Sequence, residues 1–165
     1  WRIVEGGAER QESVWNGVSA SDSTAEVVGI QDGARPCTPL GIVGQAIDAA
    51  REMGAAVLAK RVSDTLKRCD GQVQILETVD RENLWAVQTP QVFRREVILA
   101  ALAKVREEGL AITDDTAACE VLGQAVKMIE CDRPNPKATT PEDLPFIEPL
   151  LANEASETAE AAGEN

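Results

Sequence analysis

Apolar positions along the chain alternate between short β-like runs and helix-like stripes. Runs rich in β-branched and small apolar residues occupy residues 25–30, 55–62 and 126–129. Apolar residues recur at helical spacing over residues 9–18, 38–53, 94–108 and 113–122. The first two runs and the helix between them predict a βαβ unit, because parallel strands need such a crossover. The pattern therefore predicts an α/β fold with a Rossmann-like, doubly wound, mostly parallel sheet.

Residues typical of helix ends set the expected boundaries of these helices. Thr38 and Pro39 are typical of an N-cap and a first helical turn, and Gly54 predicts the end of the same helix. Thr113 or Asp114 is expected to cap a later, shorter helix, and Gly123 is expected to end it. A final helix is expected to open near residue 140, where threonine, proline and acidic residues follow one another.

Three segments depart from this alternation. Residues 63–79 are polar around a turn at Asp70-Gly71 and predict a projecting β-hairpin arm over about residues 63–80. Residues 1–4 have the pattern of a strand already under way, so we expect the chain to begin within a domain covering residues 1–152. Residues 153–165 lack large apolar side chains and predict a disordered acidic tail.

Composition restricts the chemistry. The 165 residues include no histidine, which excludes histidine-based triads and general bases. The four cysteines are scattered and indicate reduced thiols. A net charge of −12 argues against nucleic-acid or anionic-membrane partners. Because the sequence also shows no membrane-spanning run and no secretory signal, we expect a cytoplasmic protein.

Small and charged residues follow the predicted strands where a ligand crevice is expected. Gly7 and Gly33 would allow close approach of the backbone to a ligand, and Asp32 could accept protons from hydroxyl groups. Arg35 and Lys137 could hold phosphate oxygens. These residues predict a nucleotide or sugar-phosphate site. By type alone, residues in such positions more often form a turn, a loop salt bridge and a surface lysine.

An ordered series of short motifs runs through most of the chain. It comprises Gly6-Gly7-Ala8-Glu9-Arg10, Ser13-Val14, Asp32-Gly33-Ala34-Arg35-Pro36, Asp64-Thr65-Leu66-Lys67, Thr78-Val79-Asp80-Arg81, Leu84-Trp85, Gln88-Thr89-Pro90-Gln91, Thr113-Asp114-Asp115 and Asn135-Pro136-Lys137. Over residues 4–151 the series resembles the 2-C-methyl-D-erythritol 4-phosphate cytidylyltransferase family. An ordered series of this kind is far more specific than any one of its motifs.

The resemblance implies a cytidylyl transfer in isoprenoid biosynthesis. A phosphate oxygen of methylerythritol phosphate attacks the α-phosphorus of CTP, and pyrophosphate leaves with Mg²⁺ bound to it. The products are CDP-methylerythritol and pyrophosphate. No protein nucleophile is needed, so lysine, arginine and a hard cation are suitable groups. The resemblance also implies a homodimer in which the hairpin arm of one subunit reaches the site of its neighbour.

Site roles follow from matching motifs. The resemblance implies that the nucleotide is contacted by Gly7, Ala8, Ser13, Asp32, Gly33 and Lys137. It implies that the acceptor phosphate is held by Asp32, Arg35, Thr65, Arg81, Thr89 and Thr113, with Thr65 and Arg81 supplied by the arm of the neighbouring subunit. Lys137 and Arg81 are the expected catalytic residues. No protein ligand is assigned to the metal.

The chain departs from the family pattern at a few positions, and most seriously at its start. Gln31 stands where the family usually has histidine. The Gly-rich loop that opens family members and binds the triphosphate has no counterpart, so we expect an N-terminally truncated fragment with little or no activity of its own. Two alternatives stay open: a cytidylyltransferase acting on a pentitol phosphate such as ribitol 5-phosphate, and a non-catalytic nucleotide-binding or dimerisation remnant.

Overall fold

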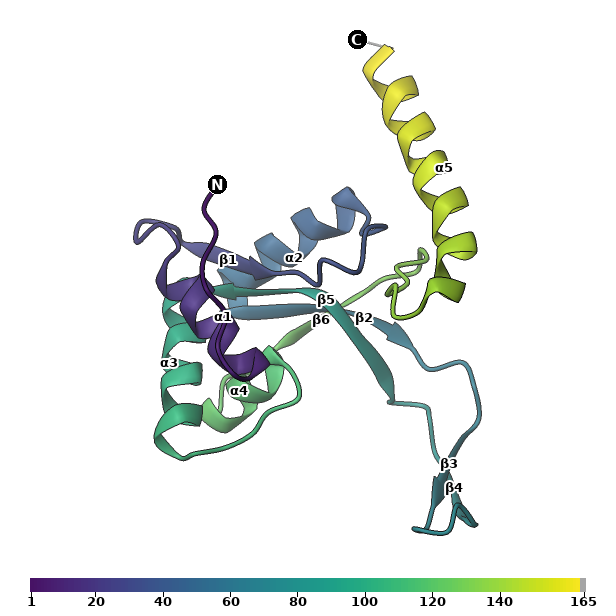
Figure 1. The fold of residues 1–165 in the computed structure, drawn as a ribbon, viewed down its shortest axis with the longest axis horizontal. Helices are drawn as coiled ribbons and strands as arrows, with labels where there is room; N and C mark the ends of the chain where they lie inside the picture. The colour runs from purple at the N-terminus through teal and green to yellow at the C-terminus, as the bar shows by residue number, and fades with distance from the viewer. Residues whose placement is uncertain (164–165) are drawn as a thin grey trace.

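The computed structural model describes the backbone of residues 1–163 and the side chains of residues 1–153. Its helices and strands follow one another in an α/β order (Figure 1). They are α1 Arg10–Ser19, β1 Val27–Ile30, α2 Leu40–Met53, β2 Ala55–Arg61, β3 Leu66–Cys69, β4 Ile75–Val79, β5 Trp85–Arg94, α3 Arg95–Glu107, α4 Asp115–Leu122, β6 Lys127–Glu130, the 3₁₀ turn Pro141–Asp143 and α5 Leu144–Gly163. The predicted α/β class is confirmed.

The main sheet within the described residues has the strand order β1-β5-β2-β6. β2 and β6 are parallel, whereas β5 runs antiparallel to both β1 and β2. β1, β2 and β6 therefore point in one direction, which confirms a mostly parallel sheet. The predicted βαβ unit is present as β1, α2 and β2, but β5 lies between its two strands. The apolar pattern of the sequence did not predict β5.

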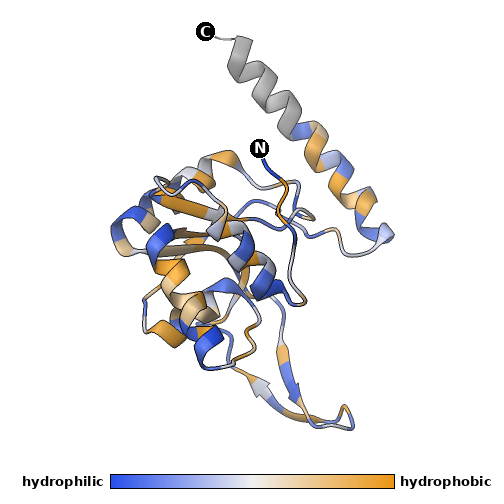
Figure 2. Cartoon of the chain, turned by 60° about the vertical axis from the view of Figure 1, so that its left-hand side comes forward, coloured by the Kyte–Doolittle hydropathy of each residue, from blue (hydrophilic) through white to orange (hydrophobic). Residues whose placement is uncertain are grey.

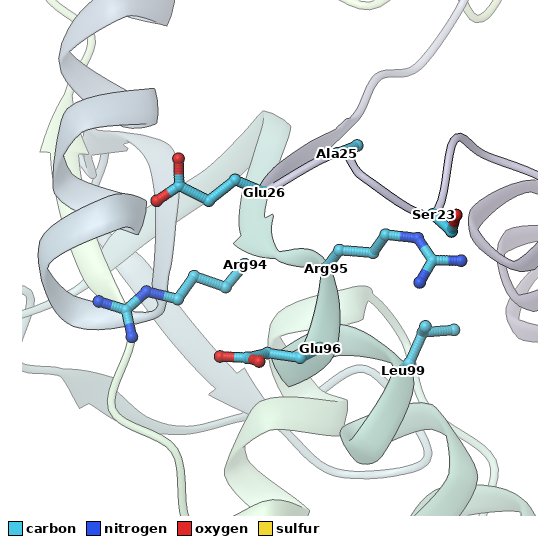
Figure 3. Close-up of a pocket in the computed structure, with 7 residues that line it drawn as sticks. All are labelled: Ser23, Ala25, Glu26, Arg94, Arg95, Glu96 and Leu99. Atoms are coloured by element: carbon cyan, nitrogen blue, oxygen red, sulfur yellow. The ribbon is translucent and has the colours of Figure 1, made fainter.

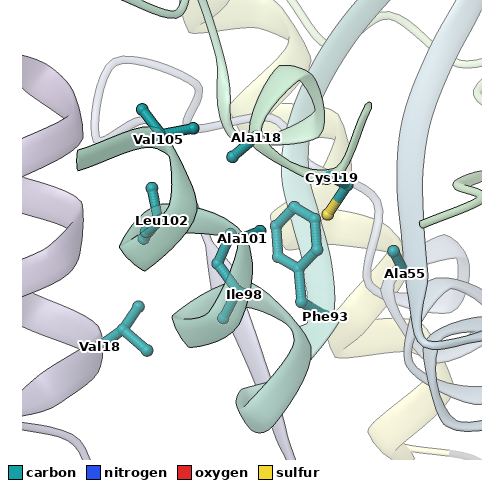
Figure 4. Packing of buried hydrophobic residues seen from close by; sticks show 9 residues of the cluster. All are labelled: Val18, Ala55, Phe93, Ile98, Ala101, Leu102, Val105, Ala118 and Cys119. Atoms are coloured by element: carbon teal, nitrogen blue, oxygen red, sulfur yellow. The ribbon is translucent and has the colours of Figure 1, made fainter. Parts of the chain in front are cut away.

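Helices cover both faces of this sheet. α2 packs on one face, while α1, α3 and α4 lie on the other. Neighbouring residues alternate between the faces: Ala55 and Phe93 belong to the core beneath α3, and Ala56 and Val92 belong to the core beneath α2. Figure 4 shows the Phe93 ring between α3 and Cys119. Burying such a side chain contributes roughly 1.5–3 kcal/mol to folding.

Most predicted helix ends are observed. Gly54 and Gly123 terminate α2 and α4 with φ of 95° and 79°, backbone angles that glycine adopts readily. Asp114 caps α4 by accepting a hydrogen bond from the Ala117 N–H. The N-cap position of α2 is Pro39, so the expectation for Thr38 was wrong. The Thr38 hydroxyl instead donates to Asn135 Oδ1 at 3.2 Å, in the loop after β6.

The hairpin formed by β3 and β4 projects from the main body, at the end opposite α5 (Figure 1). Asp70 orders its turn, because its Oδ1 accepts the N–H groups of Gln72 and Gln74 at 2.9 Å each. Nearly every hairpin side chain is exposed. In Figure 2 hydrophobic and hydrophilic residues are mixed along it, whereas hydrophobic colour concentrates on the main sheet and its helices.

The two ends of the chain differ from their expected structures. No strand is assigned to residues 1–4, so the prediction there was wrong: the segment has no strand partner within the described residues, and Trp1 and Ile3 are exposed. The backbone of α5 continues to Gly163 through most of the tail predicted to be disordered. Alanine and glutamate are strong helix formers, which accounts for this difference. Residues 164–165 lie outside the described part of the chain.

Candidate functional site

A pocket of about 360 Å³ opens beside the loops that follow β1 and β6. It is lined by Arg10, Asp32, Arg35, Val87, Gln88, Thr89, Gln91, Thr113, Asp114 and Lys137. Asp32, Arg35, Thr89, Thr113 and Lys137 are residues that the sequence analysis assigned to a phosphate-handling site. Although they span more than one hundred positions of the sequence, the fold places them on one pocket wall.

One carboxylate organises the cations of the pocket. Asp32 Oδ2 lies 3.2 Å from the Lys137 ammonium and 3.4 Å from Arg35 Nε. The turn after β1 brings Asp32 and Arg35 together, since the Arg35 N–H donates to the Asp32 carbonyl at 3.0 Å. Asp32 is largely buried, whereas Lys137 keeps 46% of its side chain exposed. The Arg35 guanidinium and the Lys137 ammonium are thus held beside one carboxylate. The pocket that they line could take a further anion.

Asn135 joins the loop after β6 to β5 and to the loop after β1. Its side chain is buried, with Nδ2 donating to the Thr89 carbonyl at 3.1 Å and to Gln88 Oε1 at 3.2 Å. Its own carbonyl accepts from Arg35 Nη1 at 2.7 Å. β1 and β6 lie at opposite edges of the sheet, and these contacts join the loops that follow them, together with the Ala138 N–H that donates to the Ala34 carbonyl at 2.8 Å. The motif containing Asn135 and Lys137 therefore serves both architecture and site.

β5 forms the floor of the pocket. Thr89 is buried and its Oγ1 accepts the Asp32 N–H at 3.0 Å. Gln91 lies two residues further along and is also buried. Gln91 donates to Asp114 Oδ2 at 2.9 Å and accepts the N–H groups of Asp115 and Thr116 at 3.0 and 3.1 Å. The start of α4, next to Thr113, is thereby fastened to β5.

Arg10 is a pocket residue to which the sequence analysis gave no role. Its two terminal nitrogens donate to the carboxylate oxygens of Asp115 at 2.8 and 2.6 Å. The hydrogen bond to Asp115 raises the pKa of the Arg10 guanidinium, so Arg10 stays charged. Burial raises the pKa of the Asp115 carboxyl, while Arg10 acts in the opposite direction. The sequence around Arg10 does not predict this pair, because Asp115 lies 105 residues away.

The residues expected to contact cytosine, namely Gly7, Ala8 and Ser13, do not line the pocket but occupy the loop and first turn leading into it. The Gly7 N–H donates to Ser13 Oγ at 3.0 Å, and the Ala8 N–H donates to Glu12 Oε2 at 2.7 Å. A side chain at Gly7 would place its Cβ 2.2 Å from Glu12 Cβ, so this close turn requires glycine.

The other predicted residues lie outside the pocket lining. Gly33 is exposed in the turn between Asp32 and Arg35, and its Cα faces open space. Thr65 and Arg81 lie at the base of the β3–β4 hairpin and are exposed. Arg81 donates to the Ser63 carbonyl. Their proposed role concerns the site of a second subunit and stays a prediction.

The described residues do not form a protein cage for a metal ion. Among them, no three His, Cys, Asp or Glu side chains gather closely enough to hold one. The two carboxylates of the pocket are already engaged, Asp32 with two cations and Asp114 with hydrogen bonds from Gln91, Thr116 and Ala117. A divalent cation at this site would thus depend on oxygens from a phosphate ligand and from water.

Cationic groups, a buried threonine and backbone loops converge here without a nucleophile activated by a base. This arrangement fits the binding and neutralisation of phosphate groups. Comparison with known proteins agrees. The sequence model of 2-C-methyl-D-erythritol 4-phosphate cytidylyltransferase matches residues 1–153. The chain belongs to this cytidylyltransferase family. The resemblance inferred from its motifs is confirmed.

Curated relatives carry the cytidylyltransferase name. The enzyme of Caldanaerobacter subterraneus is 48% identical over 151 residues, covering 92% of this chain and 66% of the relative. That of Geobacillus thermodenitrificans is 47% identical over 155 residues, covering 94% and 67%. The chain therefore spans about two thirds of the length of the cytidylyltransferases that it matches.

Solved cytidylyltransferase structures share the fold. The 4-diphosphocytidyl-2C-methyl-D-erythritol synthase of Anaerococcus prevotii superposes with a TM-score of 0.82 at 31% identity, covering 92% of this chain and 67% of that protein. The 2-C-methyl-D-erythritol 4-phosphate cytidylyltransferase of Thermus thermophilus gives a TM-score of 0.80 at 37% identity, with coverages of 88% and 70%.

A second hollow, of about 440 Å³, lies between the start of β1 and α3 (Figure 3). Its two arginines point in opposite directions and serve helix ends. Arg94 donates to the Arg51 carbonyl in the last turn of α2, and Arg95 donates to the Val18 carbonyl of α1. Lysine and arginine are well suited to satisfy such terminal carbonyls. We therefore assign this hollow a structural role.

Proposed function

We propose that the protein transfers the cytidylyl group of CTP to 2-C-methyl-D-erythritol 4-phosphate, releasing pyrophosphate and CDP-methylerythritol. The observation that carries this proposal is the cluster of Lys137, Arg35 and Asp32 beside Thr89 and Thr113 in one pocket. Membership of the cytidylyltransferase family supplies the substrates, because the relatives are named for this acceptor.

The proposed reaction is an in-line displacement. A phosphate oxygen of the acceptor forms a bond to the α-phosphorus of CTP while the bond from that phosphorus to the bridging oxygen of pyrophosphate breaks. Lys137 lies between the two phosphate groups and neutralises charge that develops on the α-phosphate. Arg35, Thr89 and Thr113 hold the acceptor phosphate, and Asp32 keeps the two cations in position. Mg²⁺ would add positive charge to the CTP phosphates that bind it.

Base recognition is proposed for the loop before α1. Gly7 and Ala8 would offer backbone carbonyls, because their N–H groups already bond to Ser13 and Glu12. The Ser13 hydroxyl donates to the Glu9 carbonyl and would use its remaining lone pair to accept from the base. Asp32 and Gly33 would lie along the ribose. The capping box of α1, in which Glu9 and Glu12 bond reciprocally to the backbone, fixes the shape of this loop. A loop shaped in advance loses less entropy when the nucleotide binds.

The partner proposed for the hairpin is a second copy of the chain. Thr65 and Arg81 lie away from the pocket of their own subunit, so a neighbouring subunit is the partner whose site they could complete. Arg81 would then offer paired donors to the attacking phosphate. The proposal includes a cytoplasmic location, supported by the free thiols Cys69, Cys119 and Cys131. In the described residues no helix is long and apolar enough to cross a membrane.

The test is a competition between acceptors. Because the chain spans about two thirds of its relatives, we would assay both the chain and a chimera in which it replaces the matching segment of the Caldanaerobacter enzyme. CTP and Mg²⁺ are supplied with equal concentrations of methylerythritol phosphate and ribitol 5-phosphate, and products are identified by mass. CDP-methylerythritol as the main product supports the proposal. CDP-ribitol as the main product would show that the acceptor is a pentitol phosphate. Nucleotide binding without any transfer would indicate a non-catalytic binding remnant.

A further inference from the structure

The first turn of α1 holds both ends of the segment over residues 110–115. Arg10 forms the paired hydrogen bonds to Asp115, the first residue of α4. Gln11, the next residue, donates to the Leu110 carbonyl at 3.1 Å and accepts the Ile112 N–H at 3.2 Å. Two consecutive side chains of one helix thus fix where this segment starts and where it stops.

The segment carries a pocket residue but has no regular structure of its own. Residues 110–114 belong to no helix or strand, and Thr113 among them lines the pocket. A loop without backbone pairing depends on side-chain contacts for its position. The contacts supplied by Arg10 and Gln11 therefore act together with those of Gln91 to set where Thr113 lies in the pocket.

The same helical turn also fixes the loop of residues 7–9, which precedes it. The N–H groups of Gly7 and Ala8 bond to Ser13 Oγ and Glu12 Oε2, side chains of the first turn of α1. The first turn of α1 therefore links two segments that lie far apart in the sequence. It bonds to the loop of residues 7–9 and to the segment of residues 110–115.

We propose that Arg10 and Asp115 are positioning residues that hold the Thr113 segment on the acceptor side and link it to the loop of residues 7–9 on the nucleotide side. The assignment of the two sides rests on the proposed function. The Asp115 side chain is fully buried and has no access to substrate. Both terminal nitrogens of Arg10 are directed to Asp115. A guanidinium and a carboxylate paired in this way are restricted in angle as well as distance.

Steady-state kinetics test this role, measured on whichever of the chain and the Caldanaerobacter chimera transfers the cytidylyl group. Asp115→Asn removes the charge, Asp115→Glu retains it, and Ile98→Val weakens the core beneath α3 without touching the pocket. We expect Asp115→Asn to lower kcat/KM for the acceptor about 100-fold, as misplacement of a binding group does. Asp115→Glu should recover most of this loss. Ile98→Val should lower the melting temperature and leave kcat/KM unchanged. If Asp115→Asn behaves like Ile98→Val, the positioning role is wrong.

Arg10→Lys is the second variant, because Arg10 is 40% exposed and lysine keeps its charge without the paired geometry. Amide hydrogen exchange then provides a measurement independent of activity. We expect faster exchange at residues 110–117 and at residues 7–9 in Arg10→Lys, and unchanged exchange in β2. If exchange becomes faster in both segments but the protein transfers nothing to methylerythritol phosphate, the link between the two segments is supported and the proposed function is rejected. Acceleration confined to residues 110–117 would overturn the linkage.

Discussion

The Lys137 ammonium and the Asp32 carboxylate lie 3.2 Å apart, although their residues come from loops after strands at opposite edges of the sheet. The same Asp32 oxygen also lies 3.4 Å from Arg35 Nε. Like charges repel, so two cations in one pocket need such a counter-charge before any substrate arrives. In the proposed function, Asp32 therefore holds the two cations where phosphate groups would bind.

The first prediction concerns Lys137. Lys137→Ala should lower kcat about 100-fold, the usual consequence of removing a group that stabilises transition-state charge. Its side chain is half exposed, so the free energy of unfolding should change by no more than about 0.5 kcal/mol. Lys127→Ala, on the exposed surface of β6, is the matched control and should retain normal turnover. Turnover and urea denaturation are measured for both, and near-normal turnover of Lys137→Ala would remove its catalytic assignment.

The second prediction concerns the Thr89 hydroxyl. Thr89→Val keeps the shape of the side chain but leaves the partly buried Asp32 N–H without its acceptor, at a cost of about 1–3 kcal/mol in stability. Loss of the hydrogen bond proposed between Thr89 and the acceptor phosphate should also raise KM for methylerythritol phosphate about tenfold. Thr89→Ser keeps the hydroxyl and should remain close to the unmodified protein in both measurements. Equal effects of valine and serine would argue against a role for the hydroxyl.

The third prediction tests whether the hairpin acts on a second subunit. Arg81→Ala and Lys137→Ala should each be nearly inactive, but their mixed dimer contains one site with both residues intact. After unfolding and refolding of an equal mixture, about a quarter of all sites should be active. The control is each variant refolded alone. If the mixture is no more active than either variant, Arg81 acts within its own subunit or has no role.

The fourth prediction uses the thiols. Burial raises the pKa of Cys119 to about 12, so this thiol stays protonated at neutral pH. Cys69 is exposed in the hairpin and should react quickly with a disulfide reagent at pH 8, while Cys119 should react only after unfolding. Because the folded pKa of Cys119 is raised, its contribution to stability is complete below pH 9 and is lost as the pH rises toward 12. Thiol titration followed by peptide mapping checks both residues, and rapid labelling of Cys119 would contradict the buried core.

Patterns with strong local signals were predicted well from the sequence. The apolar stripes gave α1, α2, α3 and α4 within a few residues, and Gly54, Gly123 and Asp114 marked their ends because each has a specific backbone preference. Asp32, Arg35, Thr89, Thr113 and Lys137 were found from ordered motifs, and the fold brings them to one pocket.

Features that depend on distant contacts were not predicted. β5 carries Pro90 and the polar residues Gln88, Thr89 and Gln91, so it lacks the continuous apolar pattern of a central strand. Thr89 and Gln91 are nevertheless buried, and they bond to the loop after β1 and to α4. The pairing of Arg10 with Asp115 has no local signal for the same reason. Residues 1–4 have a β-like composition but no strand partner within the described residues.

The central claim is that the α-phosphate of CTP is transferred to methylerythritol phosphate. It is tested most directly by following radioactive CTP labelled at either the α- or the γ-phosphate, with the chain and with the Caldanaerobacter chimera. We predict that α-label appears in CDP-methylerythritol and that γ-label appears only in pyrophosphate. Appearance of the γ-label in the acceptor product would contradict cytidylyl transfer. So would the absence of α-label from that product with both proteins.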